Sequence, residues 1–250
     1  MMQKHHKILN FDNNTYDFYK CLFPFYNKKY PVLDSFENIN NILSSNYVSE
    51  NDKQFYDVKV PEFGVNDRKS FLIRDFHNFI DNDPLFYNLY ETFIINVIKP
   101  LFPDEHKLVV QKTPNIRFHL PNCSNIGKRS SDKYDDIIGL HYDAEFSHPD
   151  NEINIVVPIT EMRDTNGIYF EPYPESNISV YEYNNMILSK NQFYMGNLNK
   201  CYHYNKINTT NTTRISMDLR IIPFSIFNTN NNSSVTSKIK FDIGNYYTLF

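Results

Sequence analysis

Two stretches of the chain alternate between polar and apolar side chains, and the first of them does so strictly. The first runs from Arg214 to Ile221, and the second runs from Glu152 to Thr160. Because successive side chains of a strand point to opposite faces, each stretch predicts a strand with one apolar face that must be covered. The polar faces carry Arg214, Ser216, Asp218 and Arg220 in the first strand, and Glu152, Asn154 and the apolar Val156 in the second. If both faces line one cavity, their polar side chains converge in it.

Residues 107–250 are expected to contain many short strands separated by turn signals. Further strands are predicted at Leu108–Leu120, Gly167–Glu171, Ile178–Tyr183, Phe193–Met195 and Lys238–Ile243. Many short antiparallel strands are typical of a jelly-roll, or cupin-like double-stranded β-helix. The 250 residues of the chain suit a single, mainly β domain with helices flanking this core.

Residues 1–106 are predicted to form a mostly helical scaffold for the β core. The strongest helix signal begins at Asp83, an N-cap residue followed by Pro84, and ends before Pro100. Its apolar residues recur at helical spacing: Phe86, Leu89, Tyr90, Phe93, Ile94, Val97 and Ile98. This stripe predicts a buried face that packs on the strands. A shorter helix is predicted over Leu33–Leu43.

A histidine and a carboxylate are separated by one residue in His141-Tyr142-Asp143. On an extended strand these two side chains point to the same face, and His203 can approach them from another strand. Two imidazoles and one carboxylate on one face of a metal leave positions open for substrates, which is typical of iron(II). A structural zinc site would be closed and would more often contain thiolates. In a chain with eight histidines a lone H-x-D motif arises easily by chance, so its surroundings must agree.

Arg214 and Ser216 begin the polar face of their strand a short distance after His203. A guanidinium can bind a carboxylate through two parallel hydrogen bonds, and a hydroxyl can add a third. The pair therefore predicts a carboxylate-bearing ligand beside the metal. Cys201 would share the strand face of His203 and is a conceivable fourth ligand, although we favour a buried structural role for it.

Several short motifs occur in order between Gly139 and Pro223. They read His141-Tyr142-Asp143, Glu152-Ile153-Asn154, Pro158-Ile159-Thr160, Thr165-Asn166, His203-Tyr204-Asn205 and Thr213-Arg214-Ile215-Ser216-Met217-Asp218-Leu219-Arg220. This order resembles the Fe(II)- and 2-oxoglutarate-dependent oxygenases, and more narrowly the streptomycin-biosynthesis-type branch of the phytanoyl-CoA dioxygenase superfamily. Independent matches in the right order are more specific than any one of them.

The resemblance implies a dioxygenase that hydroxylates a small polar metabolite, such as a sugar, an aminocyclitol or an amino acid, and releases succinate and CO2. The cofactors that it implies are Fe(II), 2-oxoglutarate and O2. It assigns metal binding and catalysis to His141, Asp143 and His203, and the distal carboxylate of 2-oxoglutarate to Arg214 and Ser216. The protein's own contribution is to position these groups and to exclude water.

Three further residues are candidates for the site, and each has a structural alternative. Asn154 and Asn205 could orient the cosubstrate or a metal ligand, but asparagine is common in this chain and either could be structural. Arg117, near the end of a predicted strand, could bind an anionic group of the substrate or form a salt bridge. The polar stretch 123–136 is expected to be a solvated loop or a lid over the site.

Composition narrows the class of partner. A net charge of −4 without a basic block argues against nucleic acid and anionic membranes as partners. The partner that the resemblance implies is a small-molecule substrate. Three cysteines without pair spacing and an N-terminus without an apolar segment indicate a cytoplasmic protein with reduced thiols. The oligomeric state stays open.

Two other classes of function remain open. A cupin-like, non-oxidative metalloenzyme, such as an isomerase or a hydrolase, would use the same ligands but would not need Arg214 and Ser216 placed for a dicarboxylate. A catalytically silent binding module could share the fold. However, burying two imidazoles and a carboxylate together without a metal would be costly.

Overall fold

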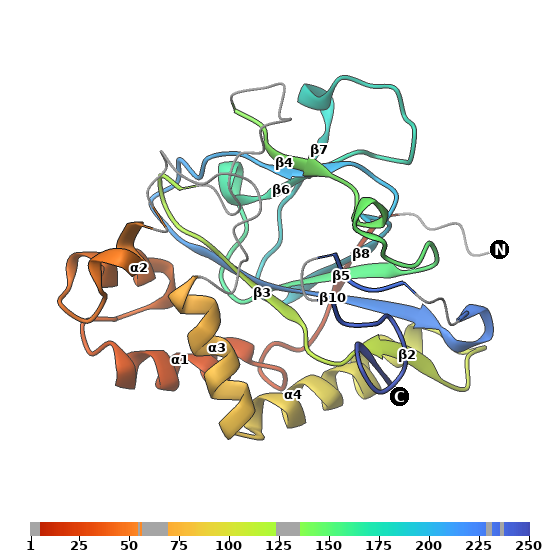
Figure 1. The fold of residues 1–250 in the computed structure, drawn as a ribbon, viewed down its shortest axis with the longest axis horizontal. Helices are drawn as coiled ribbons and strands as arrows, with labels where there is room; N and C mark the ends of the chain where they lie inside the picture. The colour runs from red at the N-terminus through yellow and green to blue at the C-terminus, as the bar shows by residue number, and fades with distance from the viewer. Residues whose placement is uncertain (1–5, 55, 57–69, 124–135, 229–231, 236–237) are drawn as a thin grey trace.

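The computed structural model describes residues 6–54, 56, 70–123, 136–228, 232–235 and 238–250. In this part of the chain a layer of helices, a large sheet and a small sheet lie one on another (Figure 1). Neighbouring strands of both sheets are antiparallel. The predicted class, mainly β structure with flanking helices, is therefore confirmed. None of the described helices combines the length and the apolar character that crossing a membrane requires.

The helices follow a first strand, β1 (Lys7–Asn10), which belongs to the large sheet. They are α1 (Phe18–Lys29), the 3-10 helix η1 (Phe36–Ser44), α2 (Glu50–Gln54), α3 (Phe71–Asn82), α4 (Leu85–Phe93), the π-turn η3 (Ile94–Ile98) and the 3-10 turn η4 (Lys99–Leu101). The strongest predicted helix is α4. At its start the carboxylate of Asp83 accepts a hydrogen bond from the N–H of Leu85 at 2.9 Å.

The helix predicted over Leu33–Leu43 is present as the 3-10 helix η1, which begins at Phe36. Its buried residues are Phe36, Ile39 and Ile42. They recur at every third position, which matches the three residues per turn of a 3-10 helix. The apolar spacing of this segment therefore selects the tighter helix.

The large sheet has the strand order β1-β8-β5-β10-β2-β11, and β3 pairs with β10 as well. Its further strands are β2 (Leu108–Gln111), β3 (Asn115–His119), β5 (Ile153–Pro158), β8 (Gln192–Gly196), β10 (Arg214–Pro223) and β11 (Tyr247–Leu249). The single strand predicted over Leu108–Leu120 is thus two strands, which pair with opposite ends of β10. Pro114 lies in the break, because proline has no N–H to donate to a ladder.

The small sheet has the strand order β4-β9-β6-β7. Its strands are β4 (Ile138–His141), β6 (Ile168–Phe170), β7 (Asn184–Met186) and β9 (His203–Asn205). The strand predicted over Ile178–Tyr183 is wrong, because a 3-10 turn capped by the side chains of Ser179 and Glu182 occupies that segment. The last strand is β11 instead of Lys238–Ile243, which makes only isolated bridges. Residues 124–135, most of the predicted loop or lid, lie outside the described residues.

The apolar faces of β5 and β10 are buried as predicted. Their side chains join those of α1, α3 and α4 in the main core: Ile155, Val157, Ile215, Met217, Leu219 and Ile221. The helical layer thus covers one face of the large sheet (Figure 1). The polar faces of the two strands turn the other way, toward the small sheet.

One row of neighbours crosses the polar face of the large sheet. Asn154 on β5 lies opposite Arg220 on β10, and Gln111 on β2 lies opposite Tyr247 on β11. The register between β2 and β10 brings Gln111 to the other side of Arg220. Directly opposite residues of paired strands point to the same face. The four side chains therefore all face the small sheet.

The packing predicts that Leu219→Ala lowers the free energy of unfolding by about 2–5 kcal/mol, because Leu219 is wholly buried and the variant leaves a cavity. Urea denaturation measures the change. As a matched control, Ile226→Ala removes a side chain that is 51% exposed and should change stability by less than about 0.5 kcal/mol. Equal losses in the two variants would contradict the packing described for β10.

Candidate metal centre

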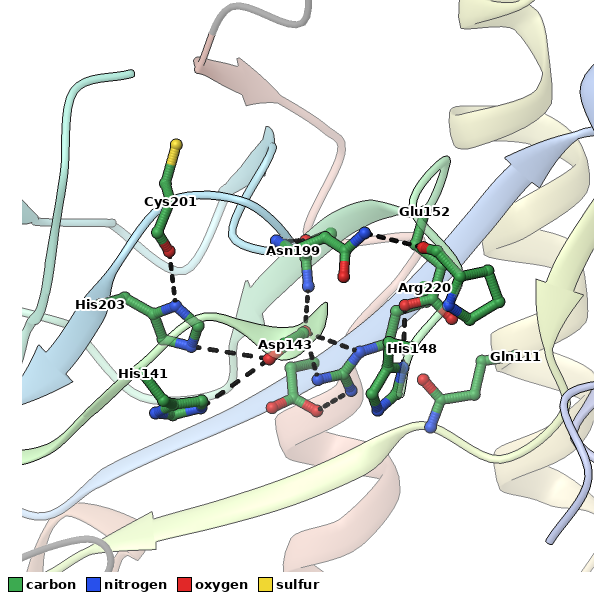
Figure 2. A network of polar contacts seen from close by, with 12 residues as sticks. Gln111, His141, Asp143, His148, Glu152, Asn199, Cys201, His203 and Arg220 are labelled. Atoms are coloured by element: carbon green, nitrogen blue, oxygen red, sulfur yellow. Dashed lines mark hydrogen bonds and ion pairs between the residues drawn. The ribbon is translucent and has the colours of Figure 1, made fainter. Parts of the chain in front are cut away.

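The side chains of His141, Asp143 and His203 meet between the two sheets. One ligand atom from each lies within 4.8 Å of the others. The Oδ1 atom of Asp143 is 3.8 Å from Nε2 of His141 and 3.7 Å from Nε2 of His203 (Figure 2). In the described part of the chain this is the one group of such residues that could hold a metal ion.

Strand pairing positions the two histidines. His141 ends β4, His203 begins β9, and the two are direct partners in the ladder, with ring centroids 4.2 Å apart. Asp143 is not on the strand, contrary to the prediction. The chain leaves β4 at Tyr142, and Asp143 opens the 3-10 turn η5 (Asp143–Phe146). The turn still brings the carboxylate to the histidine pair.

Backbone carbonyls fix the tautomer of both histidines. Nδ1 of His203 donates to the carbonyl of Cys201 at 3.1 Å, and Nδ1 of His141 donates to the carbonyl of Gly139. Gly139 has a φ of 69° at an irregularity in the β4–β9 ladder, a conformation that glycine adopts without strain. Because Nδ1 carries the hydrogen, Nε2 of each ring is left with a lone pair for a metal.

The other oxygen of Asp143 is held by three donors. Oδ2 accepts hydrogen bonds from Nδ2 of Asn154 at 2.7 Å and from two nitrogens of Arg220, Nη2 at 2.9 Å and Nε at 3.2 Å. Burial raises the pKa of Asp143, but Arg220 and the neighbouring histidines outweigh it and hold the pKa well below its usual range. The residue is therefore a carboxylate whose Oδ1 alone faces the imidazoles.

The donor set fits a divalent metal with open positions. Two nitrogens and one carboxylate oxygen, without a thiolate, match the facial arrangement that suits iron(II) better than a closed zinc site. Cys201 does not belong to the group, since its carbonyl holds His203 and its sulfur lies 3.6 Å from Nε2 of His6. Burial raises the pKa of Cys201 to about 12, which also disfavours a thiolate ligand.

A chain of ion pairs continues from Asp143 across the sheet. Nη1 of Arg220 is 3.1 Å from Oδ1 of Asp218, and Nε of Arg117 is 3.2 Å from Oδ2 of the same carboxylate. Burial raises the pKa of Asp218, but the two arginines lower it further. Arg117 lies opposite Ser216 and so on the face of the site. Its ion pair with Asp218 is the structural alternative that the sequence left open for it.

Arg220 is the residue that the sequence reasoning missed. It is buried, and it links the metal carboxylate to Asp218. The signal was its place as the last polar residue of the alternating strand, on the same face as Arg214. Its partner cannot be read from that pattern, because Asp143 is far away in the sequence.

Arg214 is completely buried, and no described residue gives it an anionic partner. Its Nη1 donates to the carbonyl of Asn166 at 2.7 Å and its Nη2 to Oδ1 of Asn205 at 3.1 Å, while Nε has no partner among the described residues. Burial and the charge of Arg117 lower the pKa of Arg214 to about 9, against the opposing effect of Asp218. A buried charge without a counter-ion is costly, so this guanidinium suits an anionic ligand.

Of the remaining candidate residues, Asn154 lies beside the metal ligands, and Asn205 and Ser216 lie beside Arg214. Asn154 binds the metal carboxylate, and its Oδ1 accepts from the backbone N–H of Asn199 at 2.8 Å. Asn205 holds Arg214 and lies two residues after His203 on β9, a separation of about 6.6 Å along a strand. Ser216 is buried on the same face of β10 as Arg214. Metal ligands and buried guanidinium are thus neighbours.

No protein-family model matches the chain. Over 170 residues it is 28% identical to the streptomycin biosynthesis protein StrG of Streptomyces griseus, a match that covers 68% of this chain and 72% of StrG. The fold is similar to that of the apo non-heme monooxygenase ThoJ, with 12% identity, 94% and 82% coverage of the two chains and a TM-score of 0.47. EvdO2 from Micromonospora carbonacea var. aurantiaca, complexed with 2-oxoglutarate, has 11% identity, 60% and 64% coverage and a TM-score of 0.37.

The geometry predicts that His141→Ala weakens divalent metal binding by on the order of 100-fold or more, since it removes one of three ligands. Isothermal titration of the apo protein with Ni(II) measures the affinity. His106 is exposed and remote from the three ligands in the chain, so His106→Ala should keep wild-type affinity. Undiminished nickel binding by His141→Ala would remove the proposed ligand set.

Proposed function

We propose that the protein is an Fe(II)- and 2-oxoglutarate-dependent dioxygenase that hydroxylates a small polar metabolite and releases succinate and CO2. The observation that carries the proposal is the pairing of two features on one face. His141, Asp143 and His203 can form a metal site with open positions. The buried guanidinium of Arg214, which has no counter-ion among the described residues, lies close to His203. The two facing sheets support a double-stranded β-helix core.

The roles of the ligands follow from their hydrogen bonds. His141 and His203 offer Nε2 to the iron because backbone carbonyls hold Nδ1. Asp143 offers Oδ1 because Asn154 and Arg220 hold Oδ2, so the carboxylate binds through one oxygen and leaves more positions open. When bound, Fe(II) with 2-oxoglutarate and O2 supplies the oxidising chemistry, and the protein positions the reactants and excludes water.

Arg214 is proposed to bind the distal carboxylate of 2-oxoglutarate, with Ser216 adding a hydrogen bond. A pKa of about 9 keeps the guanidinium charged at neutral pH. Asn205 orients it through Nη2, and Nε is still unsatisfied among the described residues. A carboxylate would give the buried charge a partner and satisfy this donor.

The substrate is proposed to be a sugar, an aminocyclitol or an amino acid. The name of the relative StrG, a streptomycin biosynthesis protein, supports a small polar metabolite. Arg117 lies on the site face and remains a proposed contact for an anionic substrate group, in addition to its ion pair with Asp218.

A non-oxidative cupin-like isomerase or hydrolase is less well supported. Such an enzyme needs the three metal ligands but has no use for a buried guanidinium beside them that lacks a counter-ion in the described part of the chain. A silent binding module is disfavoured because it has no use for two imidazoles that backbone carbonyls hold with both Nε2 atoms toward Oδ1 of Asp143.

Anaerobic titration with Fe(II) and 2-oxoglutarate tests the proposal, with the weak visible charge-transfer band of the chelate as readout. Wild type should develop the band. Arg214→Gln should bind Fe(II) normally but need on the order of 10- to 100-fold more 2-oxoglutarate, because it loses a charge-assisted pair. Arg163 is exposed, so Arg163→Gln is the matched control and should behave as wild type. Iron binding without any band in wild type would favour the non-oxidative alternative.

A further inference from the structure

A further imidazole lies in the polar network that surrounds the metal ligands (Figure 2). His148 follows η5, and its Nδ1 is 2.9 Å from Oε2 of Glu152, which is completely buried. The other oxygen of Glu152 accepts a hydrogen bond from the hydroxyl of Tyr247. A carboxylate that accepts on both oxygens leaves the hydrogen on Nδ1, so that Nε2 is the acceptor of the neutral imidazole.

Two residues at the start of β5 anchor His148 and the metal carboxylate. Asn154 on β5 binds Asp143, and Glu152, which directly precedes β5, binds His148. Only Ile153 separates the two anchors in the chain. Since Arg220 lies opposite Asn154, Glu152 is at the end of β5 away from Arg214. The metal ligands therefore separate His148 from the proposed cosubstrate position.

The C-terminal segment builds the walls around this histidine. Gly244 has a φ of 99°, and its N–H donates to the carbonyl of Tyr247 at 2.8 Å, so the chain turns before the two tyrosines. Burial, and then Glu152, raise the pKa of Tyr247, which keeps its hydroxyl a donor. The ring of Phe241 lies 4.5 Å from that of His148, and the ring of Tyr246 lies 5.9 Å away.

The buried Oε1 of Gln111 has no hydrogen-bond partner among the described residues. In the same part of the chain, Nε2 of His148 and the hydroxyl of Tyr246, on two half-buried side chains, make no hydrogen bond either. Gln111 is 2% exposed and lies opposite Tyr247 in the row that also contains Arg220. With the imidazole neutral, Nε2 of His148 and Oε1 of Gln111 can only accept a hydrogen bond. A ligand that satisfies them must bring hydroxyl or amino donors.

We propose that His148, Tyr246 and Gln111 form the subsite that recognises the substrate, and that this subsite takes polyhydroxylated or amino-bearing compounds through their donor groups. The inference deepens the proposed function and rests on it for the identity of the bound compound as substrate. In this proposal Glu152 and Tyr247 are positioning residues that keep Nε2 of His148 available as a hydrogen-bond acceptor. Glu152 fixes the tautomer of His148, and Tyr247 fixes Glu152.

The test uses full-length protein loaded with Ni(II) and 2-oxoglutarate, with myo-inositol and D-glucosamine as probes in saturation-transfer NMR. Wild type should bind both. Tyr246→Phe removes only a hydroxyl that has no hydrogen-bond partner among the described residues. It should therefore weaken probe binding by on the order of 3- to 10-fold and leave the thermal midpoint of unfolding unchanged. His148→Phe should weaken binding by at least as much, while Ni(II) affinity stays at the wild-type value. Tyr173 is 58% exposed, and Tyr173→Phe is the matched control without effect.

A second probe separates donor recognition from shape. Hexa-O-methyl-myo-inositol keeps the oxygen acceptors but has no donors, and it should not bind. Absence of probe binding in wild type, equal binding of the methylated probe, or unchanged binding in Tyr246→Phe and His148→Phe would each overturn the inference. A missing charge-transfer band together with probe binding that depends on His148 would instead remove the proposed oxygenase function and leave a recognition site for donor-rich compounds.

Discussion

The metal site depends on the buried carboxylate of Asp143, whose two oxygens have different partners. Oδ2 of Asp143 is held by Asn154 and Arg220, which are neighbours on β5 and β10, and Oδ1 is thereby aimed at the two histidines. The apolar faces of the same two strands bury the main core against the helices. Fold stability and ligand orientation therefore rest on the same pair of strands, and the ion pairs from Arg220 to Arg117 balance the buried charge.

Much of this arrangement can be predicted from sequence, for local physical reasons. Alternation over Arg214–Ile221, and less strictly over Glu152–Thr160, predicts strands and their buried faces, because side chains two residues apart on a strand point to the same face. The proline after Asp83 predicts the start of α4. The same alternation predicts that Asn154 and Arg214 share a face, and the structure brings His141, Asp143 and His203 together as the sequence reasoning expected.

The predictions that were wrong or missing concern residues whose structure depends on contacts that the local sequence pattern does not contain. Asp143 lies in a 3-10 turn although the H-x-D spacing suits a strand, and Ile178–Tyr183 is held in a turn by side-chain caps despite its apolar residues. The role of Arg220 requires Asp143, a partner distant in sequence. The Gly244–Tyr247 segment gives no functional signal until β11 docks on β2 and brings Tyr247 to Glu152.

A crystal structure of the protein grown anaerobically with Fe(II) and 2-oxoglutarate would show directly how Asp143 binds the metal and where the cosubstrate lies. We expect iron on Nε2 of His141, Nε2 of His203 and Oδ1 of Asp143 alone, with Oδ2 still bound by Asn154 and Arg220. We also expect the distal carboxylate of 2-oxoglutarate to bind Arg214. A metal bound elsewhere, or a bound 2-oxoglutarate that leaves Arg214 without an anionic partner, would contradict the proposed site.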